Sequence, residues 1–141
     1  ATPGVLNKDV TQANIATTVC KSGWTATIRP TVTYTNKLKI DQLKTTYKGL
    51  TLTFGTDPSK YEEDHLISLQ LGGNPSDPKN LWPEPYAGIG ARKKDVVETA
   101  LKRLVCANQL KLADAQKAIL DWPSAYKKYV TSADKPDTSD N

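Results

Sequence analysis

The chain contains no methionine, one phenylalanine, one histidine and two cysteines among its 141 residues. A structural zinc site of the finger type needs four Cys or His ligands, so this class of protein is excluded. No apolar run approaches the roughly 18 residues that span a bilayer, and we therefore expect no membrane partner. The length suits a single domain and is too short for two ordinary ones.

The apolar content and the charge of the chain indicate a folded protein that suits an anionic partner. Hydrophobic residues make up 38% of the chain and charged residues 24%, with enough valine, leucine and isoleucine to exclude a disordered chain. Nineteen Lys and Arg against fifteen Asp and Glu give a net charge of +4. A moderate positive charge suits an anionic partner such as nucleic acid. We expect a monomer.

The beginning of the sequence and its two cysteines favour an exported protein. The chain starts with ATPG instead of an initiator methionine, as a mature secreted protein does after removal of its signal peptide; a trimmed chain is the alternative. In an oxidising compartment Cys20 and Cys106 would pair, and two buried free thiols are the alternative. The chain-entropy model assigns about 4–5 kcal/mol of stabilisation to a disulfide that closes a loop of this length.

Hydrophobic spacing and breaking residues predict an α+β protein with one domain over residues 1–132 and a polar tail over 133–141. Helices are expected at 11–20 (capped by Asp9 or Thr11), 35–47 (capped by Thr35 and ended by Gly49), about 90–106, 112–120 and 123–130. Extended segments are expected at 25–34, 61–65 and 79–82, the last of them stopped by Pro83 and Pro85. In helix 90–106 the predicted buried stripe consists of Val97, Ala100, Leu101 and Leu104.

One short motif surrounds the only histidine. Asp64-His65 is followed by Gly72-Gly73 and then by Asn80-Leu81, just before the helix at 90–106. This run resembles the core of the HNH nucleases, in which an Asp-His pair ends the first strand, a Gly-Gly loop follows and an Asn-Leu pair opens the second. The resemblance spans about 30 residues. It implies a ββα-metal (HNH-like) hairpin plus helix, surrounded here by additional helices.

The resemblance also implies roles for three side chains. His65 would be the general base, and its unperturbed pKa near neutrality lets it take a proton at physiological pH. Asn80 would hydrogen-bond the backbone of the loop and fix the orientation of the histidine. Asp64 supplies a hard oxygen ligand of the kind that Mg²⁺ or Mn²⁺ prefers, so a divalent metal cofactor is expected.

The sequence departs from the family at the third position, where a His or Asn in the first helical turn completes the metal site. No second histidine exists. Four alternatives remain open at this stage. The metal is held by Asp64 with waters and substrate oxygens; Asp95 or Glu98 turns inward to join it; Lys93 or Lys94 supplies the positive charge directly; or the site is inactive.

Basic residues at the start of the same helix suggest how nucleic acid would be held. Arg92, Lys93 and Lys94 lie where the helix dipole is positive, an arrangement that binds phosphate without reading sequence. The sequence therefore predicts a secreted, non-specific endonuclease that hydrolyses DNA or RNA. The alternative is a catalytically inactive, cationic extracellular binding protein with the same fold.

Overall fold

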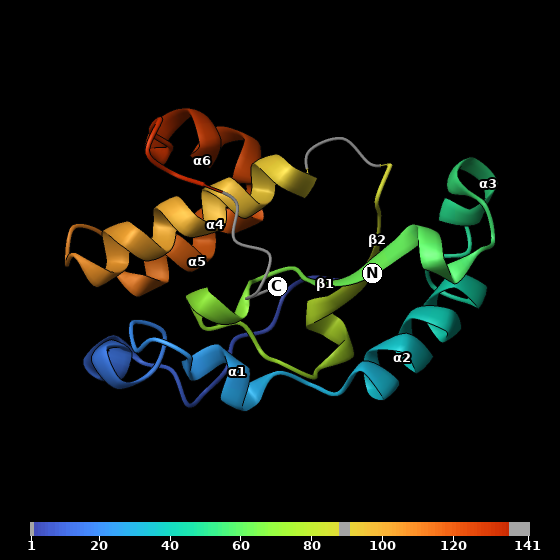
Figure 1. Ribbon diagram of the computed structural model, residues 1–141, viewed down its shortest axis with the longest axis horizontal. Helices are drawn as coiled ribbons and strands as arrows, with labels where there is room; N and C mark the ends of the chain where they lie inside the picture. Colours follow the sequence, from blue (N-terminus) through green and yellow to red (C-terminus); the bar gives the residue numbers. More distant parts are fainter. Residues whose placement is uncertain (1, 88–90, 136–141) are drawn as a thin grey trace.

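A short antiparallel hairpin lies between two groups of helices in the computed structural model of the chain (Figure 1). The structure describes residues 2–87 and 91–135. Strands β1 (Tyr61–His65) and β2 (Leu81–Pro85) form the hairpin, and helix α4 (Ala91–Cys106) follows them. The remaining elements are α1 (Trp24–Ile28), α2 (Val32–Lys44), α3 (Leu50–Phe54), α5 (Leu112–Leu120), α6 (Trp122–Tyr129) and 3₁₀ turns at Gln12–Thr17, Pro58–Lys60, Leu69–Leu71 and Pro78–Asn80.

This arrangement confirms the expected mixed α+β class and the order strand, loop, strand, helix. Helices α4, α5 and α6 pack together on one side of the hairpin, and α2 packs against both strands on the other (Figure 1). The bounds of β1 and α5 agree with the prediction, and α4 ends at Cys106 as expected. Gly90, the expected start of that helix, lies outside the described residues. Within the described ranges no helix has the length and apolar character needed to cross a membrane.

The prediction that Pro83 and Pro85 stop the second strand is wrong, because both residues lie within β2. The N–H of Tyr86, just beyond β2, donates to the carbonyl of Lys60 (3.0 Å). In β2, the backbone N–H and C=O groups of the even-numbered residues therefore face β1. Those of the odd-numbered residues, including Pro83 and Pro85, face away from β1. Since proline has no N–H, it fits on the outer side of an edge strand without loss of a ladder hydrogen bond.

The main core lies under α4, slightly rotated from the predicted stripe. Val97, Ala100 and Leu101 are fully buried, whereas Leu104 is half-buried and Val105 takes its place with 1% exposure. Val105 lies about 80° around the helix from Val97 at about 100° per residue, so the buried face turns toward that side. The same rotation carries polar residues of the first turns into the interior.

The predicted extended segment at 25–34 is wrong. Residues 24–28 form α1, and α2 begins at Val32 after its cap Thr31, whose hydroxyl accepts a hydrogen bond from the N–H of Tyr34 (3.2 Å). The segment is rich in β-branched residues, which favour strands only weakly and yield to helix capping and tertiary packing. Pro30 separates the two helices, as proline disfavours a helical residue before it.

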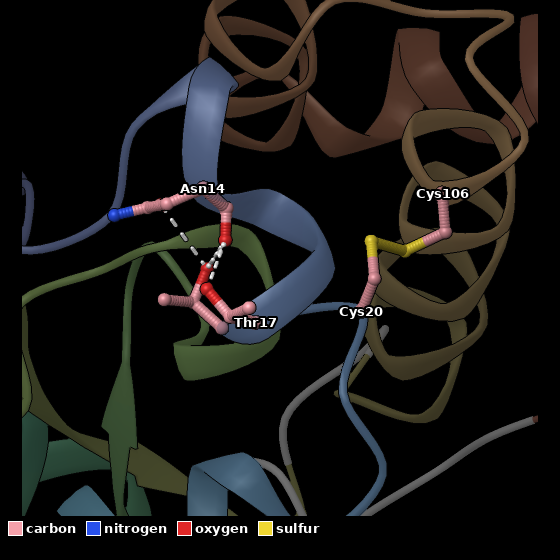
Figure 2. Close-up of a disulfide and its surroundings, with 5 residues drawn as sticks. Asn14, Thr17, Cys20 and Cys106 are labelled. Atoms are coloured by element: carbon pink, nitrogen blue, oxygen red, sulfur yellow. Dashed lines mark hydrogen bonds between the residues drawn. A yellow bond between two sulfur atoms is a disulfide. The ribbon is translucent and has the colours of Figure 1, made fainter.

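Residues 11–20 form a 3₁₀ turn over Gln12–Thr17 instead of the expected α-helix. Thr11 caps the turn as predicted, through a hydrogen bond from the N–H of Asn14 (3.3 Å). The hydroxyl of Thr17 donates back to the carbonyl of Asn14 (3.1 Å), which closes the turn just before Cys20 (Figure 2).

At the other end of the chain Asp134, placed in the predicted tail, is buried and accepts two hydrogen bonds from Arg103. Residues 136–141 of that tail lie outside the described residues.

The disulfide expected between the two cysteines is present. Cys20 and Cys106 are joined with their Cα atoms 5.7 Å apart, across a sequence separation of 86 residues (Figure 2). It ties the N-terminal turn to the C-terminal end of α4. A paired cysteine bridge of this kind is compatible with an extracellular protein.

Reduction of this disulfide is expected to lower the free energy of unfolding by about 4–5 kcal/mol, because the unfolded chain regains the entropy of an open loop. Denaturant unfolding with and without a reductant measures this loss. A Cys20→Ser, Cys106→Ser variant should show the lower stability without responding to reductant. Two reactive thiols in the denatured, unreduced protein would contradict the pairing.

Candidate functional site

Asp64 and His65 are neighbours in β1, and alternation along the strand sends their side chains to opposite faces of the hairpin. The Asp64 carboxylate meets Lys94 of α4. The His65 ring borders a cleft whose wall is formed by the chain from Arg29 to Lys39. Asp64 and His65, which are adjacent in the motif, therefore lie in two separate environments.

The orientation of His65 is set by one hydrogen bond. Its Nε2 lies 2.8 Å from the carbonyl oxygen of Pro75, and the residue as a whole is 2% exposed. A carbonyl can only accept, so Nε2 carries the hydrogen and Nδ1 carries the lone pair of the neutral imidazole. The nitrogen able to take a proton is thus Nδ1.

Asn80 holds the loop that supplies this carbonyl. Its side chain is fully buried and bonds backbone on both sides: Oδ1 accepts from the N–H of Ile67 (3.0 Å), while Nδ2 donates to the carbonyls of Ile67 (3.0 Å) and Asn74 (2.8 Å). The loop-backbone hydrogen bonds predicted for Asn80 are therefore present. Because Asn74 precedes Pro75, these bonds fix the position of the acceptor that orients His65.

The Gly-Gly pair of the motif has a steric cause. Gly72 has a φ of +83°, in the left-handed region that favours glycine. A Cβ at Gly73 would stand 1.7 Å from the carbonyl oxygen of Ile67, a backbone atom that cannot move aside cheaply. Both glycines allow the loop to fold closely against the end of β1.

On the opposite face, a buried ionic cluster joins β1 to α4. The ammonium of Lys94 donates to Oδ2 of Asp64 (2.9 Å) and to the carbonyl oxygen of His65 (3.0 Å), and lies 3.3 Å from Oε1 of Glu98. The indole N–H of Trp82 also donates to Oδ2 of Asp64 (3.3 Å). Lys94 and Asp64 are each 4% exposed and Glu98 is fully buried.

In this cluster the positive charge of Lys94 and the negative charge of the neighbouring carboxylates compensate each other. Burial alone would lower the pKa of Lys94, but the carboxylates of Asp64 and Glu98 outweigh it and raise that pKa well above its ordinary range. Burial raises the pKa of Glu98 to about 7, against the opposing attraction of Lys94. Lys94 therefore remains charged over the whole physiological range, with Asp64 as its nearest counterion.

The divalent metal that the resemblance implies does not fit these residues as they stand. The expected ligand Asp64 is occupied by an ammonium, and a second cation beside Lys94 would meet strong repulsion in a buried site. Among the residues that the structure describes, no group of three His, Cys, Asp or Glu side chains is placed to hold a metal ion. Of the alternatives for the third position, both Glu98 and Lys94 point inward.

Lys94 also differs from the other two predicted phosphate ligands. Arg92 and Lys93 are exposed on α4, whereas the Lys94 ammonium is buried among the groups described above. The prediction placed all three side chains on a phosphate-binding surface. The physical reason for the difference is the rotation of α4, which turns Lys94 toward the hairpin and leaves its two neighbours in solvent.

The cleft on the His65 side has a volume of about 300 Å³. Its lining includes two cations, Arg29 and Lys39, together with Glu63 and the exposed ring of Tyr86. Lys39 also donates to a backbone carbonyl of β1 (3.0 Å), which holds α2 against the hairpin. Sequence reasoning missed both cations because it placed Arg29 in an extended segment, and their approach to His65 depends on the packing of α2.

Stability is expected to fall as the pH rises from about 5 to about 8. Burial raises the pKa of Glu63 and Glu84 to about 8, and that of Glu98 to about 7, from an ordinary value of 4.5. Between these limits the folded state binds more protons than the unfolded state, so a rising pH favours unfolding. Thermal unfolding across this range measures the effect, and a Glu63→Gln, Glu84→Gln variant should give a flatter profile. A midpoint that rises toward pH 8 would contradict it.

Comparison of the chain with protein-family models, with curated proteins and with solved structures gives no match.

Proposed function

We propose that this protein cleaves nucleic acid by hydrolysis of phosphodiester bonds, with His65 as the general base and an HNH-like hairpin and helix as its core. One observation carries the proposal: the only histidine is oriented by a backbone carbonyl and borders a cleft that also contains Arg29 and Lys39. A general base can activate the nucleophile, and neighbouring cations can stabilise the charge that develops on an anionic phosphate.

Each group of the cleft has a distinct task in this proposal. Nδ1 of His65 takes the proton of the attacking hydroxyl or water, and the fixed Nε2–H bond to Pro75 keeps the ring in the required tautomer. The new P–O bond forms as the P–O bond to the leaving oxygen breaks, and that oxygen takes a proton from the imidazolium or from solvent water. Arg29 and Lys39 neutralise the phosphate oxygens as charge accumulates on them. The proposal assigns no step to Asp64, which faces away from the cleft, and none to a divalent ion.

Contacts with the rest of the nucleic acid, outside the cleft, are independent of base sequence. Arg92 and Lys93 are exposed at the start of α4 and would contact phosphates on either DNA or RNA. We also propose that the protein is secreted and acts as a monomer; the disulfide supports an oxidising compartment.

Neutralisation of Arg92 and Lys93 together, as Arg92→Gln and Lys93→Gln, is expected to flatten the plot of log affinity against log salt concentration by about one to two units. Each phosphate contact contributes a slope of about 0.9 for duplex DNA, because binding releases condensed counterions. Fluorescence anisotropy over a range of salt concentrations measures the slope. The exposed residues Lys117 of α5 and Lys111, which precedes that helix, provide a matched double-substitution control. An unchanged slope for the Arg92, Lys93 variant would place the binding surface elsewhere.

A second function has one observation in its favour. The Asp64–Lys94 ion pair uses the carboxylate that the family pattern reserves for a metal, as an inactive, cationic extracellular binding protein would allow. Incubation of supercoiled plasmid with the protein separates the two functions. A nuclease converts the plasmid to the nicked form, and a binding protein only retards it in the gel.

A further inference from the structure

The environment of the Lys94 ammonium is that of a bound cation. Three oxygens from three different residues surround Nζ: a carboxylate oxygen of Asp64 at 2.9 Å, the carbonyl oxygen of His65 at 3.0 Å and a carboxylate oxygen of Glu98 at 3.3 Å. The ammonium donates hydrogen bonds to the first two of these oxygens and forms an ion pair with the third. Carboxylate and carbonyl oxygens are also the ligand types that Mg²⁺, Mn²⁺ and Ca²⁺ select.

The site of the Lys94 ammonium is buried, so another cation could occupy it only in place of that ammonium. Asp64 and Glu98 come from β1 and α4, and both are withdrawn from water. Two carboxylates in such a site need a positive partner, since an unpaired buried charge is strongly unfavourable. The neighbouring Lys93, one residue before Lys94 on the same helix, is exposed, and its ammonium lies over the ring of Tyr126, 5.7 Å from the ring centre.

We propose that Lys94 is the resident cation of this site: its ammonium stands where a divalent metal would otherwise sit between the hairpin and α4, and it keeps such ions out. The chain thereby retains an oxygen-ligand pocket that links strand and helix, while the cation is supplied covalently by the helix itself. Removal of the lysine side chain is expected to open the pocket to a divalent ion.

Lys94 also bears on the conditions for cleavage, a consequence that rests on the proposed function. If the protein cleaves nucleic acid at the His65 cleft, its cleavage rate should not depend on a metal held by Asp64. The wild-type protein would then remain active in EDTA. Loss of cleavage under all conditions would remove the proposed function and leave the assignment of Lys94 intact, because metal binding is measured separately.

The test is Mn²⁺ binding by four folded proteins: wild type, Lys94→Ala, Lys94→Gln and the control Lys93→Ala. Isothermal titration calorimetry gives the affinity, and thermal unfolding with and without MnCl₂ gives a second readout, because a ligand of the folded state raises the midpoint. Wild type and Lys93→Ala should show no saturable site. Lys94→Ala should show one saturable Mn²⁺ site, which is absent from the wild-type protein.

Two results would overturn the proposal. One is a saturable Mn²⁺ site in the wild-type protein that disappears in Asp64→Asn, since the pocket would then accept a metal beside Lys94. The other is a folded Lys94→Ala or Lys94→Gln protein that binds no Mn²⁺, since the oxygens would then not form a cation site. If Lys94→Ala fails to fold, the wild-type titration and the near-isosteric Lys94→Gln protein decide.

Discussion

Substitution of Asp64 by alanine is expected to lower the free energy of unfolding by about 3–5 kcal/mol. Asp64 is the nearest counterion of Lys94, and both side chains are 4% exposed. Removal of Asp64 leaves a buried ammonium whose remaining ion-pair partner is Glu98, and breaking a buried pair in this way costs about 3–5 kcal/mol. From the sequence alone, with Asp64 as a metal ligand, the same substitution would mainly raise the metal requirement.

Urea unfolding measures this loss, and the matched control is Asp41→Ala at an exposed position of α2. The control should change stability by no more than about 0.5 kcal/mol. An Asp64→Ala, Lys94→Met double variant removes both charges and should be more stable than Asp64→Ala alone. Equal effects of Asp64→Ala and Asp41→Ala would show that the buried pair does not stabilise the fold.

Substitution of His65 by alanine is expected to lower the rate of nucleic-acid cleavage by about 10²–10⁴-fold, the usual effect of removing a positioned general base. No other histidine exists in the chain to take over the role. Lysine and tyrosine are ordinarily protonated at pH 7 and are poor bases there. Binding should be retained, because it is assigned to cations and not to a neutral imidazole.

Two controls separate a chemical role of His65 from a structural one. Circular dichroism and thermal unfolding establish whether the variant is folded, since the ring is buried and bonded to Pro75. Added imidazole should restore part of the activity of His65→Ala if the missing group is a base. Equal cleavage by wild type and a folded His65→Ala protein would withdraw His65 as the base.

The sequence is informative where local periodicity decides the structure. The bounds of α5 follow directly from its apolar spacing, and those of β1 follow from the residues around the motif. Between residues 24 and 34 the local preference pointed the other way, because β-branched residues favour strands while the fold places two helices there. The position of the prolines in β2 depends on which edge of the hairpin is unpaired, which no local pattern encodes.

The candidate site was predictable only in part for a similar reason. The loop bonds of Asn80 follow from the motif, whereas the separation of Asp64 and His65 follows from strand alternation. The spacing of Lys94 and Glu98, one helical turn apart, was the available signal for a buried pair. The predicted buried stripe did not include these two positions, because the burial of Val105, which rotates the helix, is a tertiary effect.

The most direct measurement of the central claim is the fate of nucleic acid held by the wild-type protein. End-labelled DNA and RNA of the same sequence are incubated with a molar excess of protein, in Mg²⁺, in Mn²⁺ and in EDTA, and each sample is run on native and denaturing gels. We expect shortened strands of at least one substrate on the denaturing gel, including in EDTA. Strands that are retarded on the native gel but remain intact under every condition would contradict it and identify a binding protein.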